Sequence, residues 1–241
     1  MSNFKPTTLD LFAAASDQHL DADWPSADRF PLNQDGTRVE DTVLADLRSS
    51  SSPLIVTGFA TLDRLIDFVA NADQCDRIRV VFGSEPFASR QDTFSIKELD
   101  LPHEMKEYWL ERGISILLSA KLLLCIERLK ANTLQTRYVA RSSWRLHAKL
   151  YVADNAATIG SSNFTDPGLR NQLEANVRFR RNDDARKPAQ KEEHLRYQET
   201  AQVAEQFWSL GTDYNAQLIE LLEQLLRLVP WEEAVARASA E

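Results

Sequence analysis

The sequence predicts an α/β fold, because stretches typical of buried strands alternate with stretches typical of amphipathic helices. The clearest case lies between residues 54 and 82. An apolar run at residues 54–56 is followed by a helix whose apolar side chains recur at i, i+3, i+4 and i+7 from Leu62, and then by a second buried-type strand at residues 78–82. This order predicts a right-handed parallel crossover unit in a sheet.

The other elements follow the same reasoning. We expect helices at residues 41–47, near 103–112 and at 120–131, the last of them strongly apolar, and a helical end with an apolar stripe at 218–229. We expect strands at 134–139, 146–153, 158–160 and 175–179, and a serine-rich loop up to Pro53. Such a stripe is typical of core packing and can also serve an interface. The expected domains are an amino-terminal helical and loop extension at 1–52, a main domain at 53–190, and carboxy-terminal helices at 191–241 that pack on it or lead to a further domain.

The composition excludes several classes of protein. The chain lacks any stretch near the ~20 uncharged apolar residues that a membrane span needs, and its polar first residues differ from a signal peptide. We therefore expect a cytoplasmic protein. Cys75 and Cys125 have no metal-ligand spacing and are predicted to be free core thiols, and the small number of histidines disfavours a zinc site.

The net charge of −8 argues, for the whole chain, against nucleic-acid binding. The charge is unevenly distributed, however. Residues 133–187 carry 10 Lys and Arg against 5 Asp and Glu, a balance of +5, whereas 1–132 carry 14 against 21 and 188–241 carry 4 against 10. An anionic ligand would be attracted to the middle segment. A solvated basic face is the alternative interpretation of the same charges.

One motif in the middle segment carries recognisable chemistry. His147, Lys149 and Asp154 have the form H-x-K-x4-D, and Gly160, Ser161 and Asn163 follow as G-S-x-N. On a strand, His147 and Lys149 would leave the same face of the sheet. An imidazole can attack phosphorus, while an ammonium, a hydroxyl and an amide can hold the non-bridging oxygens. Gly160 would allow the sharp turn that aims Ser161 and Asn163 at that face.

These residues resemble the phospholipase D superfamily, and the stretch Phe164–Leu169, with Asn171 and Glu174, resembles its single-motif nuclease branch. The resemblance implies a mixed, largely parallel sheet flanked by helices on both faces. It also implies that His147 forms a phosphohistidine, that Lys149, Ser161 and Asn163 bind phosphate, and that no metal or other cofactor is needed. Asp154 would be structural. Glu174 is the candidate to orient His147, with a plain surface carboxylate as the alternative. The five residues between Asp154 and Gly160, where six are usual, are a departure from the family.

The family needs two such motifs, because a second histidine protonates the leaving group. His19, His103 and His194 all lack a lysine two positions on, so a second copy is not found in this sequence. A symmetric homodimer that places two His147 residues across one cleft would supply it. We expect the substrate backbone to be held by four arginines that flank the motif: Arg141, Arg145, Arg178 and Arg180.

The predicted function is therefore a metal-independent nuclease that cuts DNA in preference to RNA. The alternative is a catalytically silent module that binds nucleic acid or dimerises. A lipid phosphodiesterase is not favoured, because the sequence shows no membrane-binding helix with a basic face. The chain also resembles nuclease-type domains that precede helicase or translocase motors, which implies a possible fused helicase; it has no G-x-x-x-x-G-K-[ST] loop of its own.

Overall fold

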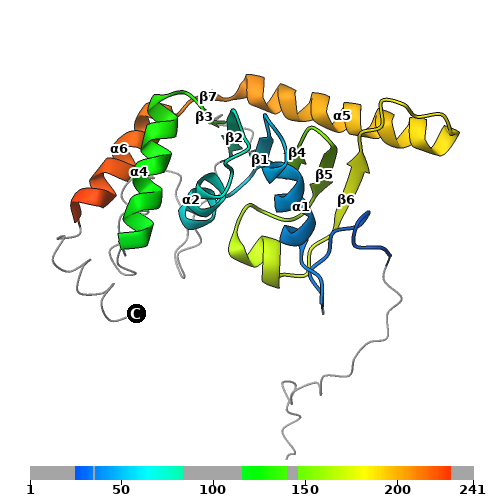
Figure 1. Cartoon of the computed structure of the whole chain (residues 1–241), viewed down its shortest axis with the longest axis horizontal. Helices are drawn as coiled ribbons and strands as arrows, with labels where there is room; N and C mark the ends of the chain where they lie inside the picture. The colour runs from blue at the N-terminus through cyan, green and yellow to red at the C-terminus, as the bar shows by residue number, and fades with distance from the viewer. Residues whose placement is uncertain (1–24, 35, 84–115, 140–145, 229–241) are drawn as a thin grey trace, which may run out of the picture.

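The computed structural model describes residues 25–34, 36–83, 116–139 and 146–228 (Figure 1). Its helices are α1 (Val39–Arg48), α2 (Leu62–Ala70), α4 (Ile116–Lys130), α5 (Pro188–Leu210) and α6 (Asn215–Leu228), with a helical turn η1 at Pro167–Asn171. Its strands are β1 (Leu54–Thr57), β2 (Ile78–Phe82), β3 (Leu134–Tyr138), β4 (Leu150–Val152), β5 (Ala156–Gly160), β6 (Asn176–Arg180) and β7 (Thr212–Asp213). The expected helix near 103–112 lies outside the described residues.

All seven strands form one sheet in the order β6-β5-β4-β1-β2-β3-β7. The central strands β1, β2 and β3 are parallel, and α2 forms the crossover between β1 and β2. The outer pairings, β1 with β4, β4 with β5, β5 with β6 and β3 with β7, are antiparallel. The structure thus confirms a mixed α/β sheet and shows that its parallel part is the centre.

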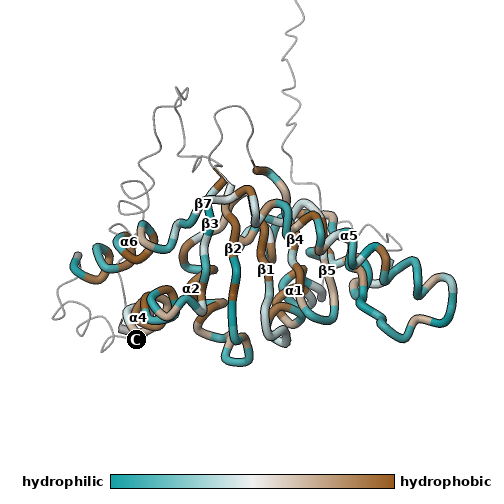
Figure 2. The backbone as a smooth tube through the Cα atoms, turned by 90° about the horizontal axis from the view of Figure 1, so that it is seen from above, coloured by the Kyte–Doolittle hydropathy of each residue, from teal (hydrophilic) through white to brown (hydrophobic). Residues whose placement is uncertain are grey.

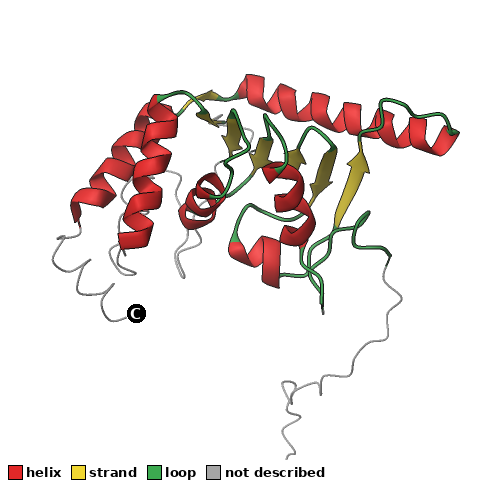
Figure 3. Ribbon diagram, in the orientation of Figure 1, coloured by secondary structure: helices red, strands yellow, loops and turns green. Residues whose placement is uncertain are grey.

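Helices cover both faces of the sheet, as expected (Figure 3). β1 is buried along its whole length and is apolar except at its last residue (Figure 2), and its side chains alternate between the faces. Ile55 joins the main core with α1, α2, α4 and α6, whereas Leu54 and Val56 join a second cluster beneath α5. Because α1 and α6 share the main core with the sheet, residues from both expected flanking regions help to build the central fold. Both cysteines are buried and free.

One strand is shorter than the sequence predicts. The prediction extended from residue 146 to 153, but β4 contains only Leu150–Val152. The reason is the length of its partner: Leu150 pairs with Val56, and β1 ends one residue later at Thr57. Of the four residues before Leu150, Lys149 still accepts a hydrogen bond from the Gly160 N–H, and the other three lie beyond the pairing with β1. This is where the motif begins.

Candidate active site

The motif residues gather where several strands end together. β1 and β2 reach this edge with their carboxyl ends, β5 also ends here, and β4 and β6 start here. The Gly160 N–H donates to the Lys149 carbonyl oxygen at 3.1 Å, and the Ser161 N–H donates to the Ala175 carbonyl oxygen at 3.0 Å. These bonds place the lysine of the first half of the motif beside the turn that carries the second half.

His147 and Lys149 lie on the same side of their segment, as predicted. Leu146 and Ala148 pack into the cluster beneath α5, so the alternating side chains of His147 and Lys149 face the other way. His147 is exposed, whereas Lys149 is only 3% exposed and donates from Nζ to the His147 carbonyl oxygen at 2.9 Å. Burying an ammonium is unfavourable unless polar groups surround it. This lysine is therefore held in place against the backbone of His147.

Gly83, which belongs to no recognised sequence motif, lets the segment with His147 approach the sheet. A Cβ atom at Gly83 would lie 2.1 Å from the Leu146 carbonyl oxygen and 2.9 Å from the Gly58 carbonyl oxygen, both backbone atoms. Any other residue would displace the chain directly before His147. The only signal in the sequence is a glycine immediately after a buried strand.

Ser161 is bonded to Glu174, the predicted orienting carboxylate. Its hydroxyl donates to Glu174 Oε2 and accepts the Ala175 N–H at 2.9 Å. The structure thus places Glu174 on the serine of the motif. Gly160 is required by close approach, since a Cβ there would lie 2.1 Å from Asn176 Oδ1 and 2.4 Å from the Ala175 carbonyl oxygen. The prediction that Gly160 permits a sharp turn is replaced by this steric reason, because its φ is not positive.

Asn163 is fixed from the carboxyl end of β1. The Phe59 N–H donates to Asn163 Oδ1 at 3.2 Å, and the Thr57 hydroxyl lies 3.5 Å from the same oxygen. Because Oδ1 is held toward β1 as an acceptor, the amide nitrogen Nδ2 points to the other side. An amide N–H is the group that can bind a phosphate oxygen.

A buried layer of side chains supports the G-S-x-N turn from below. The Tyr151 hydroxyl donates to the Ser162 carbonyl oxygen at 2.6 Å, and Asn176 Nδ2 donates to Ser162 Oγ and to the Pro31 carbonyl oxygen, each at 2.9 Å. Burial raises the pKa of the Tyr151 hydroxyl, so it remains a neutral donor. This layer could not be predicted from the sequence, because nothing in the linear pattern pairs Tyr151 or Asn176 with the motif.

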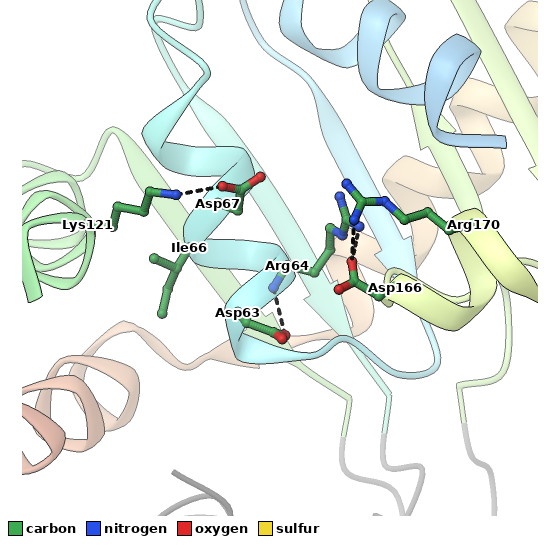
Figure 4. A pocket seen from close by; sticks show the side chains of 7 residues that line it. All are labelled: Asp63, Arg64, Ile66, Asp67, Lys121, Asp166 and Arg170. Carbon is green, nitrogen blue, oxygen red and sulfur yellow. Dashed lines mark hydrogen bonds and ion pairs between the residues drawn. The ribbon is translucent and has the colours of Figure 1, made fainter. Parts of the chain in front are cut away.

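A network of ion pairs anchors the turn that follows Asn163. Arg64, which is 3% exposed, is bonded to Asp166 and, through Nη1, to Glu40 Oε2 at 3.1 Å. Arg170 Nε contacts Glu40 Oε1 at 2.7 Å. Figure 4 shows both guanidinium groups beside Asp166, at a pocket of about 280 Å³. These contacts join α1, α2 and η1, and they fix the position of the chain after the motif.

Asp154 lies at the opposite end of the sheet from Ser161. Its Oδ2 accepts from the Ser51 N–H at 2.8 Å and the Ser51 hydroxyl at 2.9 Å, while its own N–H donates to Ser50 Oγ at 3.1 Å. Burial opposes ionisation, but these hydrogen bonds outweigh it and lower the pKa of Asp154. The contacts are those of a structural residue that holds the loop before β1.

The four expected substrate arginines are not equivalent. Arg141 and Arg145 lie outside the described residues. Arg178 is buried and forms two bonds to Asp46, at 2.6 and 2.7 Å, and one to Asp28 at 2.9 Å. Arg180 is exposed and bonded to both oxygens of Asp28. Both arginines face the end of β6 away from Asn176, so the structure does not support their predicted contact with a substrate at the motif.

The other potential ligands and acids are limited. His19 and His103 lie outside the described residues, and His194 accepts from the Asn182 N–H at 3.1 Å with Nδ1, on α5. The described part of the chain contains no group of three or more His, Cys, Asp or Glu side chains that could hold a metal ion. Nor does it contain a helix long and apolar enough to cross a membrane.

A protein-family model for the cardiolipin synthase, phospholipase D-like domain matches residues 48–196. This range covers more than half of the chain and includes every described residue of the motif. The chain therefore belongs to the phospholipase D-like family, and the resemblance to that superfamily is confirmed. No match is found among curated proteins.

Several solved structures are similar to this chain at low sequence identity. Nuc from Salmonella typhimurium, a phospholipase D family member, is 15% identical, with 77% of this chain and 96% of that chain covered and a TM-score of 0.47. NucT from Helicobacter pylori is 10% identical; the match covers 72% of this chain and 89% of NucT, with a TM-score of 0.42. Phosphatidylserine synthase from Haemophilus influenzae Rd KW20 is 16% identical; the match covers 88% of this chain and 45% of the synthase, with a TM-score of 0.46.

Proposed function

We propose that this protein is a metal-independent phosphodiesterase that cleaves DNA through a phosphohistidine intermediate. The observation that carries the proposal is the convergence of His147 and Lys149 with Ser161 and Asn163 at one edge of the sheet, through the bonds between Lys149 and Gly160 and between Ser161 and Ala175. A nucleophile, a cation and a neutral amide donor are groups that phosphoryl transfer uses, and Ser161, whose hydroxyl donates to Glu174, lies beside them.

The proposed reaction has two steps. In the first, a nitrogen of His147 forms a bond to phosphorus, the bond from phosphorus to the leaving oxygen breaks, and that oxygen takes a proton from a general acid. In the second, water replaces His147 on phosphorus and returns a proton to the same acid, now acting as a base. Lys149 and Asn163 would hold the non-bridging oxygens while negative charge redistributes over them.

The general acid is the reason to propose a homodimer. The motif occurs once in the sequence, so one chain supplies one His147. A two-fold axis beside the exposed imidazole would bring a second His147 to the same phosphate without any further sequence. One imidazole would then act as the nucleophile and the other, protonated, as the acid.

DNA is the proposed substrate because the residues after the motif resemble the nuclease branch and because the middle segment of the chain is basic. Arg141 and Arg145 are the proposed contacts to the DNA backbone. A fused helicase or translocase remains part of the proposal only as a partner that would deliver such DNA. The presence of all four phosphate-site residues favours an enzyme over a catalytically silent binding module.

The decisive experiment is cleavage of a labelled DNA duplex and single strand with EDTA present. We expect cleavage to persist, because the groups named for phosphate are side chains of this protein. Activity that vanishes in EDTA and returns with magnesium would contradict the mechanism. Binding of DNA without cleavage, under all conditions tested, would favour the silent module.

The homodimer is tested separately by mass and dilution. Light scattering should give twice the chain mass, and activity per chain should fall as the protein is diluted through the dimer dissociation constant. A fully active monomer would contradict the shared cleft. The general acid would then have to be a group of the same chain other than a second His147.

A further inference from the structure

We propose that Thr57 is a positioning residue that sets the orientation of the Asn163 amide for phosphate binding; this inference rests on the proposed function. Thr57 is the last residue of β1 and is fully buried, with 0% exposure. It belongs to no part of the H-x-K-x4-D or G-S-x-N pattern and lies 106 residues from Asn163 in sequence. The structure nevertheless places its hydroxyl between the two chain segments that hold Asn163.

The hydroxyl of Thr57 has one proton, and the distances decide where that proton goes. The Phe59 carbonyl oxygen lies 2.6 Å from Thr57 Oγ1, whereas Asn163 Oδ1 lies 3.5 Å away. The hydroxyl therefore donates to Phe59. Its oxygen also accepts the Phe164 N–H at 3.1 Å. Thr57 thus joins the turn after β1 to the residue that directly follows Asn163.

This clamp determines which amide atom of Asn163 is held toward β1. With the turn held, the Phe59 N–H is placed 3.2 Å from Asn163 Oδ1. The terminal torsion of an asparagine side chain has only weak intrinsic preferences, so hydrogen bonds decide which way the amide points. If the amide rotated by half a turn, Oδ1 would lose the Phe59 N–H, and under the proposed function it would turn toward the phosphate and repel it. The Thr57 hydroxyl therefore favours the orientation in which Nδ2 can donate.

The chain contains a matched buried threonine that can serve as the control. Thr136, on β3, is 1% exposed and donates from Oγ1 to the side-chain oxygen of Asn215 at 2.9 Å. Its backbone N–H donates to the same oxygen at 2.7 Å. Thr136→Val removes a hydroxyl from a buried strand position close to an asparagine side chain, as Thr57→Val does, but Asn215 begins α6 and is not part of the motif.

The first test compares the steady-state kinetics of DNA cleavage by Thr57→Val, Thr57→Ser and Thr136→Val, with thermal unfolding of each. We expect Thr57→Val to lower kcat by about tenfold to a hundredfold, as expected for a misplaced catalytic contact. Thr57→Ser keeps the hydroxyl and should recover most of the rate. Thr136→Val should lose comparable thermal stability and keep its kcat. Equal kcat values for the two valine variants would overturn the inference.

The second test asks whether Thr57 acts through Asn163. In an Asn163→Ala background, Thr57→Val should add almost no further loss of kcat, because the group that it positions is already absent. If the loss of kcat in the double variant equals the product of the two single-variant losses, Thr57 acts independently of Asn163, and the inference is overturned.

A binding readout separates this inference from the proposed reaction. We expect the wild-type chain to bind inorganic phosphate in calorimetry, Thr57→Val to raise its Kd several-fold and Thr136→Val to leave it unchanged. If phosphate binds with this pattern but DNA is not cleaved, the nuclease proposal fails and the role of Thr57 stands. If the wild-type chain binds no phosphate and cleaves no DNA, both fail.

Discussion

The two ends of the sheet treat polar side chains in different ways, although the same strands connect them. At the end where β1 begins, charges are paired with one another: Arg178 with Asp46, Arg180 with Asp28. At the end where β1 finishes, ion pairs of Arg64 and Arg170 hold the chain after the motif. The side chains of the motif itself are bonded largely to backbone groups, as Lys149 is to the His147 carbonyl oxygen and Asn163 to the Phe59 N–H. The first arrangement neutralises charge, whereas the second sets the direction of donors.

This difference explains how a basic segment can mislead. β6 runs between the two ends, with Asn176 beside the G-S-x-N turn and Arg180 at the far end, opposite Ala156. Counted in sequence, Arg178 and Arg180 belong to the positive segment. In the structure, three contacts with carboxylates surround Arg178 and hold its guanidinium in the fold. The charge of a segment therefore indicates an anion site only after the ion pairs that its residues form elsewhere in the fold are known.

The largest expected effect comes from the nucleophile. His147→Ala should reduce DNA cleavage by at least about a thousandfold, since no other group can form the phosphohistidine. Because His147 is exposed, the variant should unfold at nearly the same temperature as the wild type. Single-turnover cleavage with trapping of a phosphorylated protein would measure the effect. A phosphorylated intermediate in His147→Ala would assign the nucleophile to another residue.

The next largest effect is a loss of stability at the end of the sheet away from the motif. Arg178→Met leaves Asp46 buried without its cation and should cost about 3 to 5 kcal/mol in the free energy of unfolding. The kcat of the protein that remains folded should be unchanged, since Arg178 lies away from the motif. Urea unfolding combined with kinetics at low temperature checks both. Arg180→Met, at an exposed pair, should cost less than about 1 kcal/mol. A loss of kcat in Arg178→Met beyond the loss of folded protein would show that Arg178 contributes to the active site.

Sequence patterns predicted the centre of the fold because local and long-range preferences agree there. The run at residues 54–56, the helix from Leu62 and the strand at 78–82 correspond to β1, α2 and β2. The motif residues were recognised from their spacing and from the family resemblance, and their roles stay predictions. What could not be predicted depends on which segments meet: the approach of Gly83 to Leu146, the support of Ser162 by Tyr151, and the ion pair of Arg178 with Asp46. These partners are separated in sequence by 11 to 132 residues and leave no periodic signal.

A smaller effect concerns the arginines whose environment the structure does not describe. Neutralising Arg141 and Arg145 together should weaken binding to unrelated DNA sequences alike and reduce the slope of log K against log salt by about 2, one unit for each phosphate contact. Arg180→Gln is the matched control and should leave the slope unchanged, because Asp28 already neutralises Arg180. Equal slopes for all variants would mean that the positive segment does not bind the DNA backbone.

The smallest effect concerns Asp154, the motif residue that lies at the structural end. Its folded-state pKa is below the usual 3.8, so ionised Asp154 stabilises the fold above that pH, and the stabilisation is lost as the pH falls through the lower folded value. Asp154→Asn should therefore lower the free energy of unfolding at pH about 7, and the gap from wild type should shrink toward zero in strong acid.

Ser51→Ala removes one of the two bonds from Ser51 to Asp154 and keeps the backbone N–H, so its gap should have the same pH dependence at smaller size. Urea unfolding of the three proteins across this pH range measures both gaps, and phosphodiesterase kinetics at neutral pH should be the same for all. A gap that does not change with pH would show that the Asp154 charge does not stabilise the loop before β1. A fall in kcat without a fall in stability would place Asp154 with the chemistry, and the functional contrast between the two ends of the sheet would no longer hold for this residue.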